Sequence, residues 1–341
     1  LQKCISSHPK CRVNTTKLPT RLLELSKPNP GHVRLRDTQD LPQSTSYVTL
    51  SHCWGDAKFF KLTGASHEQL SNGVPVSLLA NTFQDAVHVA EKLSASYIWV
   101  DSLCIIQDSL QDWRQESVTM CDVYKGSLCN IAAAASSSSS EGGCFRERDP
   151  QLIRPCLVAT KFTNRANDDF LLESQTEQWL PHDQQQPLYR RAWVVPERFL
   201  APRVLNFGSQ YLFWECRTCK ASEIYPGGIS AVLGDLSPLS GINADISGHA
   251  DMYSATYHWN QIVMEYSKCA LTKGSDKLVA ISGIAREFKV LGDPGDYLAG
   301  MWRNTVMPQM LWRTANLPGV DFPKQIRNGQ YYAPSWSWAS V

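Results

Sequence analysis

The sequence has almost no excess of charge of either sign. Its 33 Lys and Arg residues are balanced by 32 Asp and Glu residues, which gives a formal net charge of +1. Proteins that bind nucleic acid or anionic lipid usually carry a clustered basic excess, because phosphate groups must be neutralised at the interface. No such cluster stands out along the chain. We therefore expect neither nucleic acid nor a membrane surface among its partners.

The chain also lacks long apolar runs. No stretch approaches the roughly 20 consecutive apolar residues that a membrane-spanning helix needs. The first residues show no charged segment followed by an apolar one, as a secretory signal would. Internal repeats are absent as well. Together these absences predict a cytoplasmic protein without a membrane anchor.

Cysteine, in contrast, is abundant, with 11 residues and therefore an odd number. Cys121 falls in a predicted helix and Cys129 in the predicted strand that follows it. Cysteines inside core elements favour reduced thiols over a disulfide framework.

One group of cysteines has a second interpretation. Cys4, His8 and Cys11 lie close together near the N-terminus, and Cys216 and Cys219 follow far downstream. Thiolates and an imidazole can hold Zn²⁺ in tetrahedral geometry. The spacing is irregular for a structural zinc module, so zinc at Cys4, His8, Cys11 and Cys216 is an alternative to simple buried or surface thiols.

The composition supports a large core. Hydrophobic residues make up 43% of the chain and charged residues 19%, which suits one large domain or two merged ones. Predicted strands at 47–51, 97–101 and 128–134 alternate with predicted helices at 82–93 and 110–124. This alternation predicts an α/β fold with a parallel sheet and right-handed crossover helices.

Changes in pattern divide the chain into three parts. Residues 1–46 are expected to form an N-terminal arm that packs on the core, with a strand at 21–25, and residues 47–150 the α/β core. Residues 151–341 are expected to form an α+β extension. It should contain antiparallel strands at 156–160, 170–173, 204–207 and 211–215, helices at 193–200, 252–270, 276–288 and 297–312, and a last strand at 336–338. Residues 55–80 are expected to form a surface connection that could cover a pocket.

Residues 97–108 (YIWVDSLCIIQD) are the most informative, because an apolar strand runs directly into an acid, a thiol and an amide. In open α/β sheets, ligands bind outside the carboxyl ends of the strands. Asp101, Cys104 and Gln107 are therefore candidates for the rim of a site. The alternatives are that Asp101 caps a turn and that Cys104 belongs to the core.

In the helix that follows, Glu116 shares an apolar stripe with Trp113 and Tyr124. Burying a lone carboxylate costs several kcal/mol. Glu116 is therefore either functional or paired with Arg203 or another arginine.

These segments resemble the fungal heterokaryon-incompatibility (HET) domain. The resemblance is carried by residues 47–56 (YVTLSHCWGD), by 97–108, and by Trp113, Glu116, Met120 and Tyr124 on the helix. It continues through 191–198 (RAWVVPER), 202–205 (PRVL) and 213–216 (FWEC), and through late segments at 271–285, 297–300 and 334–340. It thus extends over nearly the whole chain.

Two positions depart from the family pattern. His52 stands where the family often has tyrosine, which adds a titratable group beside Cys53. Pro196 stands where the family usually has glutamine before the glutamate, which removes a side-chain amide and a backbone N–H donor.

The resemblance implies a flavodoxin-like core, because HET domains are distantly similar to TIR domains. Some TIR domains cleave NAD with one glutamate, and the W-x-x-E spacing after Trp113 assigns that role to Glu116, with Asp101 beside it. The implied pocket residues are His52, Cys53, Trp54, Cys104, Gln107, Trp113, Trp193, Glu197 and Arg203. For the tryptophans the alternative is core packing, and for Glu197 and Arg203 it is a buried pair with each other.

The implied function is that of a nucleotide or NAD glycohydrolase-type hydrolase, an effector in fungal self/non-self recognition or programmed cell death. NAD would be its substrate, and no cofactor is expected. One alternative is a HET-like enzyme of fungal secondary metabolism that cyclises or hydrolyses another small molecule. The other is a non-enzymatic signalling or assembly module. A small-molecule substrate is the expected partner, and homo-oligomerisation is left open.

Overall fold

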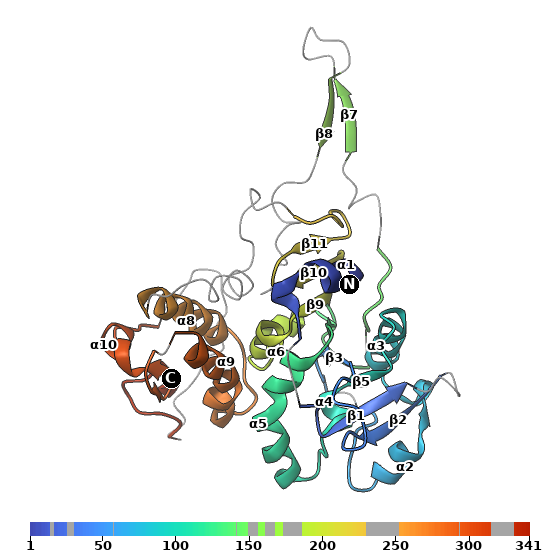
Figure 1. The fold of residues 1–341 in the computed structure, drawn as a ribbon, viewed down its shortest axis with the longest axis horizontal. Helices are drawn as coiled ribbons and strands as arrows, with labels where there is room; N and C mark the ends of the chain where they lie inside the picture. The colour runs from blue at the N-terminus through green and yellow to red at the C-terminus, as the bar shows by residue number, and fades with distance from the viewer. Residues whose placement is uncertain are drawn as a thin grey trace.

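The computed structural model describes residues 1–13, 17–25, 31–56, 58–140, 142–148, 156–160, 168–172, 186–229, 252–292, 294–314 and 331–341. Within them a nine-stranded mixed sheet forms the centre, in the order β11-β10-β9-β6-β3-β5-β1-β2-β4. Figure 1 shows α3 on one side of this sheet and α5 and α6 on the other. The α/β fold predicted from the sequence is confirmed.

Four neighbouring strands of this sheet are parallel. They are β5 (Tyr97–Trp99), β3 (Val48–Ser51), β6 (Asn130–Ala132) and β9 (Arg203–Phe207). Helix α3 (Asn81–Lys92) connects β3 to β5, and α5 (Leu110–Gly126) connects β5 to β6. Counted along the chain, the parallel strands stand in the order 2-1-3-4, as in flavodoxin-like sheets. In such sheets ligands bind where the order reverses, which here is the carboxyl end of β3 and β6.

Antiparallel strands extend the sheet at both edges. On one side β1 (Arg21–Leu25) pairs with β5, followed by β2 (His32–Asp37) and β4 (Val74–Pro75). On the other side β10 (Leu212–Cys216) and β11 (Lys220–Ser222) follow β9. Strand β9 pairs antiparallel with β10, as expected, but it also runs parallel to β6, which was not expected. The sheet therefore includes strands from both sides of the boundary predicted near residue 150, and that boundary stays a prediction.

The remaining elements are short or lie outside the main sheet. The helices are α1 (Gln2–Ser7), α2 (His67–Asn72), α4 (Asp101–Cys104), α6 (Val194–Leu200), α8 (Met252–Ser267), α9 (Lys277–Gly292) and α10 (Val306–Gln309). The 3-10 turns of the described residues are η1 (Pro9–Cys11), η2 (Val76–Leu78), η4 (Pro187–Arg190), η7 (Gly274–Asp276), η8 (Arg303–Thr305) and η9 (Trp338–Ser340). Strands β7 (Cys156–Thr160) and β8 (Asp168–Leu172) pair with each other, as do β12 (Tyr297–Leu298) and β13 (Met301–Trp302).

Local sequence explains the core helices. In α3 the buried residues recur at helical spacing and include Phe83, Ala86, Val87 and Ala90. Helix α5 begins at an N-cap, since the Ser109 hydroxyl accepts a hydrogen bond from the backbone N–H of Asp112. No helix in the described ranges is long and apolar enough to cross a membrane.

Two predictions for the C-terminal part are wrong. The segment predicted as a helix at 297–312 forms the β12–β13 hairpin before α10. Ala299 and Gly300 adopt positive φ values of 47° and 96°, which a continuous helix cannot accommodate. The predicted last strand is a 3-10 turn, Trp338–Ser340, in which Trp338 Nε1 donates to the carbonyl oxygen of Gly300 at 2.9 Å.

A glycine allows α9 to pack closely against α5. A Cβ atom at Gly283 would lie 1.8 Å from Cys121 Sγ, and Cys121 is buried. Alanine favours a helix interior by about 1 kcal/mol over glycine, but such overpacking typically costs more. We expect Gly283→Ala to lower the free energy of unfolding in urea by about 1–2 kcal/mol. Ser282→Ala, at the exposed neighbouring position, should change it by less than about 0.5 kcal/mol, and a stabilised Gly283→Ala variant would contradict this packing.

Candidate functional site

The carboxyl ends of the parallel strands meet at one edge of the sheet. Ser51 at the end of β3 is in register with Ala132 of β6, which is in register with Asn206 of β9. Asp101 begins α4 directly after β5, so the strand predicted at 97–101 ends two residues early. The site residues predicted at 52–54 and at 101 are therefore brought to the same edge.

Asp101 is held in place by two donors. Trp54 Nε1 donates to its Oδ2 at 2.9 Å, and the backbone N–H of Ser102 donates to its Oδ1 at 2.6 Å. The Asp101 side chain remains 26% exposed. The carboxylate of Asp101 is therefore bonded to the backbone in the first turn of α4 and remains partly exposed, and its role in a functional site stays a prediction.

His52 lies beside this carboxylate but is buried. Its Nε2 is 3.6 Å from Asp101 Oδ1 and makes no hydrogen bond within the described ranges. Burial lowers the pKa of His52 to about 4, with Asp101 opposing the shift and Arg191 adding to it. The imidazole is therefore neutral at pH 7. His52 packs edge-to-face against Phe83, whereas Cys53 belongs to a separate hydrophobic cluster that includes Ala132. The side chains of His52 and Cys53 therefore point in different directions, as those of neighbouring residues on an extended strand do.

Aromatic rings and a lysine border Asp101. Trp54 meets Phe59 edge-to-face with ring centroids 6.0 Å apart, and Phe59 meets Phe83 in the same way at 5.4 Å. Lys61 Nζ lies 4.6 Å from the ring centroids of both Trp54 and Phe59. Phe59 and Lys61 belong to the connection predicted at 55–80, and sequence reasoning did not single them out. The pair of aromatics before a lysine, Phe59-Phe60-Lys61, was the available signal.

A second carboxyl lies behind the end of β3. Ser51 Oγ donates a short hydrogen bond to Glu197, and Asn130 Nδ2 donates to Ser51 Oγ at 2.9 Å. Burial raises the pKa of Glu197 to about 7, which the Ser51 hydrogen bond and the charge of Arg191 only partly offset. Glu197 can therefore exchange a proton near neutral pH. Ser51 and Asn130 were not predicted, because single polar residues within strands carry no spacing signal.

The expected pair between Glu197 and Arg203 does not form. Arg203 donates to Cys4 Sγ at 3.1 Å and to the carbonyl oxygens of Leu128 and Cys11. The buried ion pair in this region joins Arg198 to Glu215, with Arg198 Nε donating at 2.8 Å. Neighbouring residues on a helix face different directions, so Glu197 contacts β3 while Arg198 contacts β10.

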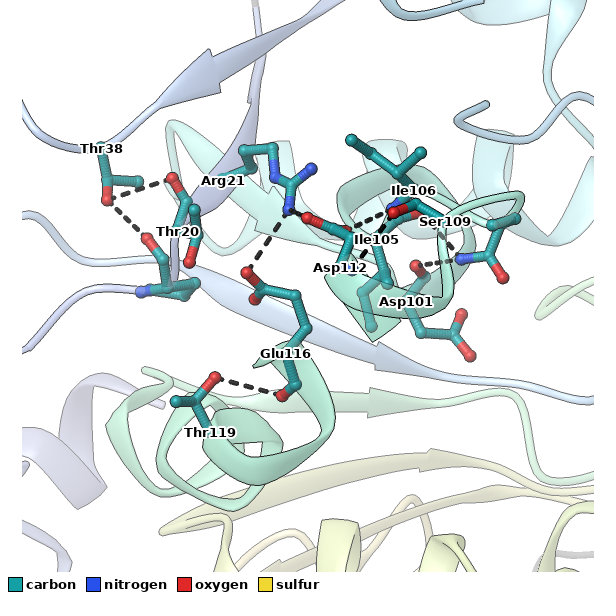
Figure 2. A network of polar contacts seen from close by, with 12 residues as sticks. Thr20, Arg21, Thr38, Asp101, Ile105, Ile106, Ser109, Asp112, Glu116 and Thr119 are labelled. Carbon is teal, nitrogen blue, oxygen red and sulfur yellow. Dashed lines mark hydrogen bonds and ion pairs between the residues drawn. The ribbon is translucent and has the colours of Figure 1, made fainter. Parts of the chain in front are cut away.

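Figure 2 shows the surroundings of Glu116. Its side chain is 2% exposed, and Arg21 Nη2 lies 3.4 Å from Glu116 Oε1 and 2.5 Å from Asp112 Oδ1. Asp112 Oδ2 accepts a hydrogen bond from the backbone N–H of Ile106 at 2.7 Å. In Figure 2 the Asp101 carboxylate points away from Arg21. Glu116 is thus paired with Arg21 rather than Arg203, and its catalytic role stays a prediction.

The other predicted site residues lie nearby in varied settings. Cys104 is buried, and burial raises the pKa of its thiol to about 12, so the thiol stays protonated and matches the core alternative. Gln107 Nε2 donates to the carbonyl oxygens of Asp101 at 3.0 Å and Ile105 at 2.8 Å, which fixes the turn after α4. Trp113 on α5 is half-buried, and Trp193 before α6 packs against the main core.

Four predicted metal ligands come together elsewhere. The ligand atoms of Cys4, His8, Cys11 and Cys216 all lie within 4.8 Å of one another. Among the residues with described positions, no other group of three or more His, Cys, Asp or Glu side chains meets the same condition.

Comparison with known proteins identifies a family for the part of the chain that contains Ser51, His52, Trp54 and Asp101. Residues 47–197 match the family model described as heterokaryon incompatibility protein (HET). No curated protein and no solved structure matches the chain. The matched segment begins just before β3 and ends at Glu197, so it contains Ser51, His52, Trp54 and Asp101. Residues 47–197 of this chain therefore belong to the heterokaryon incompatibility (HET) family.

Proposed function

We propose that the HET domain hydrolyses the N-glycosidic bond of a nucleotide, with NAD as the substrate, and that it acts as an effector in fungal self/non-self recognition or cell death. One observation carries the proposal. Asp101 presents a partly exposed carboxylate, fixed by Trp54 Nε1 and the Ser102 N–H, at the carboxyl end of β5. Strand β5 is next to β3, so Asp101 lies beside the point between β3 and β6 where ligands bind in flavodoxin-like sheets.

The reaction suits a site with one exposed carboxylate. Cleavage of the bond between ribose and nicotinamide develops positive charge on the sugar, which a fixed carboxylate stabilises. Nicotinamide leaves as a neutral base, so the leaving group needs no second acid. Asp101 supplies this negative charge in the proposal.

The neighbours of Asp101 match other parts of such a substrate. The rings of Trp54 and Phe59 offer faces and edges for a base. Lys61 supplies a cation beside both rings for a phosphate group. His52 is buried and neutral beside Asp101, with its Nε2 3.6 Å from Asp101 Oδ1, so it adds no charge to the site.

Glu116 acts as a positioning residue in this proposal. Together with Asp112 it neutralises Arg21, and Asp112 holds the backbone N–H of Ile106 in the turn that follows Asp101. Substitution of Glu116 should therefore reduce activity less than substitution of Asp101.

Nicotinamide release from NAD by the purified protein tests the proposal. We expect Asp101→Asn to lower the rate by at least about 100-fold, because the amide cannot stabilise the developing charge. Asp296→Asn is the matched control, since the Asp296 side chain is 63% exposed and forms an ion pair with the exposed Arg303. Circular dichroism should show both variants folded. An Asp101→Asn variant as active as the wild type would contradict the proposal.

A non-enzymatic assembly module is the second candidate. The ion pair between Glu116 and Arg21 favours it, because this pair accounts for the buried Glu116 without catalysis. In that case the wild type releases no nicotinamide, and light scattering reports a defined oligomer. An enzyme of secondary metabolism would also leave NAD intact, but it would bind another small molecule in a manner that Asp101→Asn weakens.

A further inference from the structure

Two distant parts of the chain meet at the N-terminal segment. Cys4 lies on α1, His8 follows that helix, and Cys11 ends η1, while Cys216 ends β10. Figure 1 shows α1 lying over β9 and β10. Three thiols and one imidazole thus converge from segments more than 200 residues apart in sequence.

The separations suit a tetrahedral metal ion. Zinc binds thiolate sulfur at about 2.3 Å and histidine nitrogen at about 2.0–2.1 Å, which places the ligand atoms roughly 3.4–3.8 Å from one another. His8 Nδ1 lies 3.4 Å from Cys216 Sγ, and all four ligand atoms lie within 4.8 Å of one another. Small side-chain shifts would therefore complete the geometry.

A buried cation and a backbone donor face these sulfur atoms. Arg203 is 3% exposed and donates to Cys4 Sγ at 3.1 Å, and no carboxylate pairs with Arg203 among the described residues. A buried guanidinium requires an anion nearby, and the sulfur atoms can provide it. The backbone N–H of Cys219 donates to Cys216 Sγ at 3.2 Å, as donors around metal-bound sulfur do.

The alternative is a group of unmetallated buried thiols. Such a group accounts for the contact between His8 and Cys216 as a hydrogen bond, but it would leave Arg203 without a counter-charge among the described residues. The described cysteines form no disulfide in the structure.

We propose that Cys4, His8, Cys11 and Cys216 bind one Zn²⁺ ion. Four protein ligands leave no open position for substrate, so the site is structural. It fixes α1 and η1 to the end of β10, next to Arg203 at the start of β9. The site is independent of Asp101 and of the proposed hydrolysis.

Metal content of the purified full chain tests this proposal directly. We expect inductively coupled plasma mass spectrometry to find about one zinc per chain under reducing conditions. Cys4→Ser and Cys216→Ser should each lose most of that zinc. Cys219→Ser is the matched control, since Cys219 is a neighbouring half-buried cysteine outside the cluster, and it should keep its zinc. Equal zinc loss in Cys219→Ser and Cys216→Ser would overturn the assigned ligand set.

A measurement on the wild type covers the case in which the serine variants fail to fold. Wild-type protein stripped of metal should bind Co²⁺ with the d–d bands of a tetrahedral ion and a thiolate-to-cobalt charge-transfer band, and added Zn²⁺ should abolish both. Chelation should also lower the melting temperature, and Zn²⁺ should restore it. Wild-type protein that contains no zinc and gives no such bands with Co²⁺ would overturn the proposal, as would a disulfide among these cysteines found by mass spectrometry.

Discussion

Replacing Arg21 by methionine is expected to lower the free energy of unfolding by about 3–5 kcal/mol, the usual cost of removing one partner of a buried ion pair. Methionine keeps most of the side-chain volume but not the charge. Glu116, 2% exposed, and Asp112, 17% exposed, would then both lack their cation. Urea denaturation followed by circular dichroism measures the change.

The neighbouring strand offers a matched control. Arg34 on β2 also forms an ion pair, with Glu24, but its side chain is 45% exposed. Exposed pairs contribute only about 0–1 kcal/mol, so Arg34→Met should change stability by no more than that. Adding Glu116→Gln to Arg21→Met should recover part of the loss, since it removes one unpaired charge. Equal losses in Arg21→Met and Arg34→Met would show that the buried network does not contribute as described.

Replacing Glu197 by glutamine is expected to stabilise the protein at pH 8 and to change its stability little at pH 4.5. The pKa of Glu197 is raised from 4.5 to about 7 by burial. Below about pH 4.5 this carboxyl is protonated in both the folded and unfolded states, and its full contribution is present. As the pH rises from about 4.5 to about 7, the unfolded chain loses this proton while the folded chain keeps it, so the contribution of Glu197 to the free energy of unfolding is lost. The pKa shift corresponds to about 3 kcal/mol of stability. Glutamine does not titrate, so the Glu197→Gln variant keeps this stability at pH 8.

His52 acts with the opposite sign in nearly the same range. Its pKa is lowered from 6.5 to about 4, so its contribution is present above about pH 6.5 and is lost as the pH falls toward 4. The two contributions therefore largely cancel in the wild type. For this reason the measurement is the difference in unfolding free energy between Glu197→Gln and the wild type at each pH. A difference that stays constant from pH 4.5 to 8 would contradict a raised pKa at Glu197.

The sequence predicted the parallel core because its signals are local. Apolar strands alternate with helices from β3 to β6, and the short spacing from Trp54 to Asp101 through one crossover brings both to the same edge. The parallel pairing of β9 with β6 could not be predicted, because it depends on α6 and on a connection of 70 residues. Residue composition alone does not specify which way such a strand enters the sheet.

The sequence also did not predict which residues pair with Glu116 and with Arg203. Glu116 was expected to be either functional or paired with Arg203 or another arginine. Arg21 lies 95 residues away on β1, and no spacing rule connects the two. The same holds for Arg203, which contacts Cys4 and Cys11 rather than Glu197. Long-range pairs of this kind depend on how β1, α5 and the N-terminal segment pack in three dimensions.

The most direct test of the central claim is the rate of nicotinamide release from NAD by the wild type, Asp101→Asn and Glu116→Gln, all shown to be folded. We predict release by the wild type, a loss of at least about 100-fold in Asp101→Asn, and a smaller loss in Glu116→Gln. Release that depends on Glu116 but not on Asp101 would contradict the site described here. No release by the wild type at high protein concentration would contradict NAD hydrolysis itself.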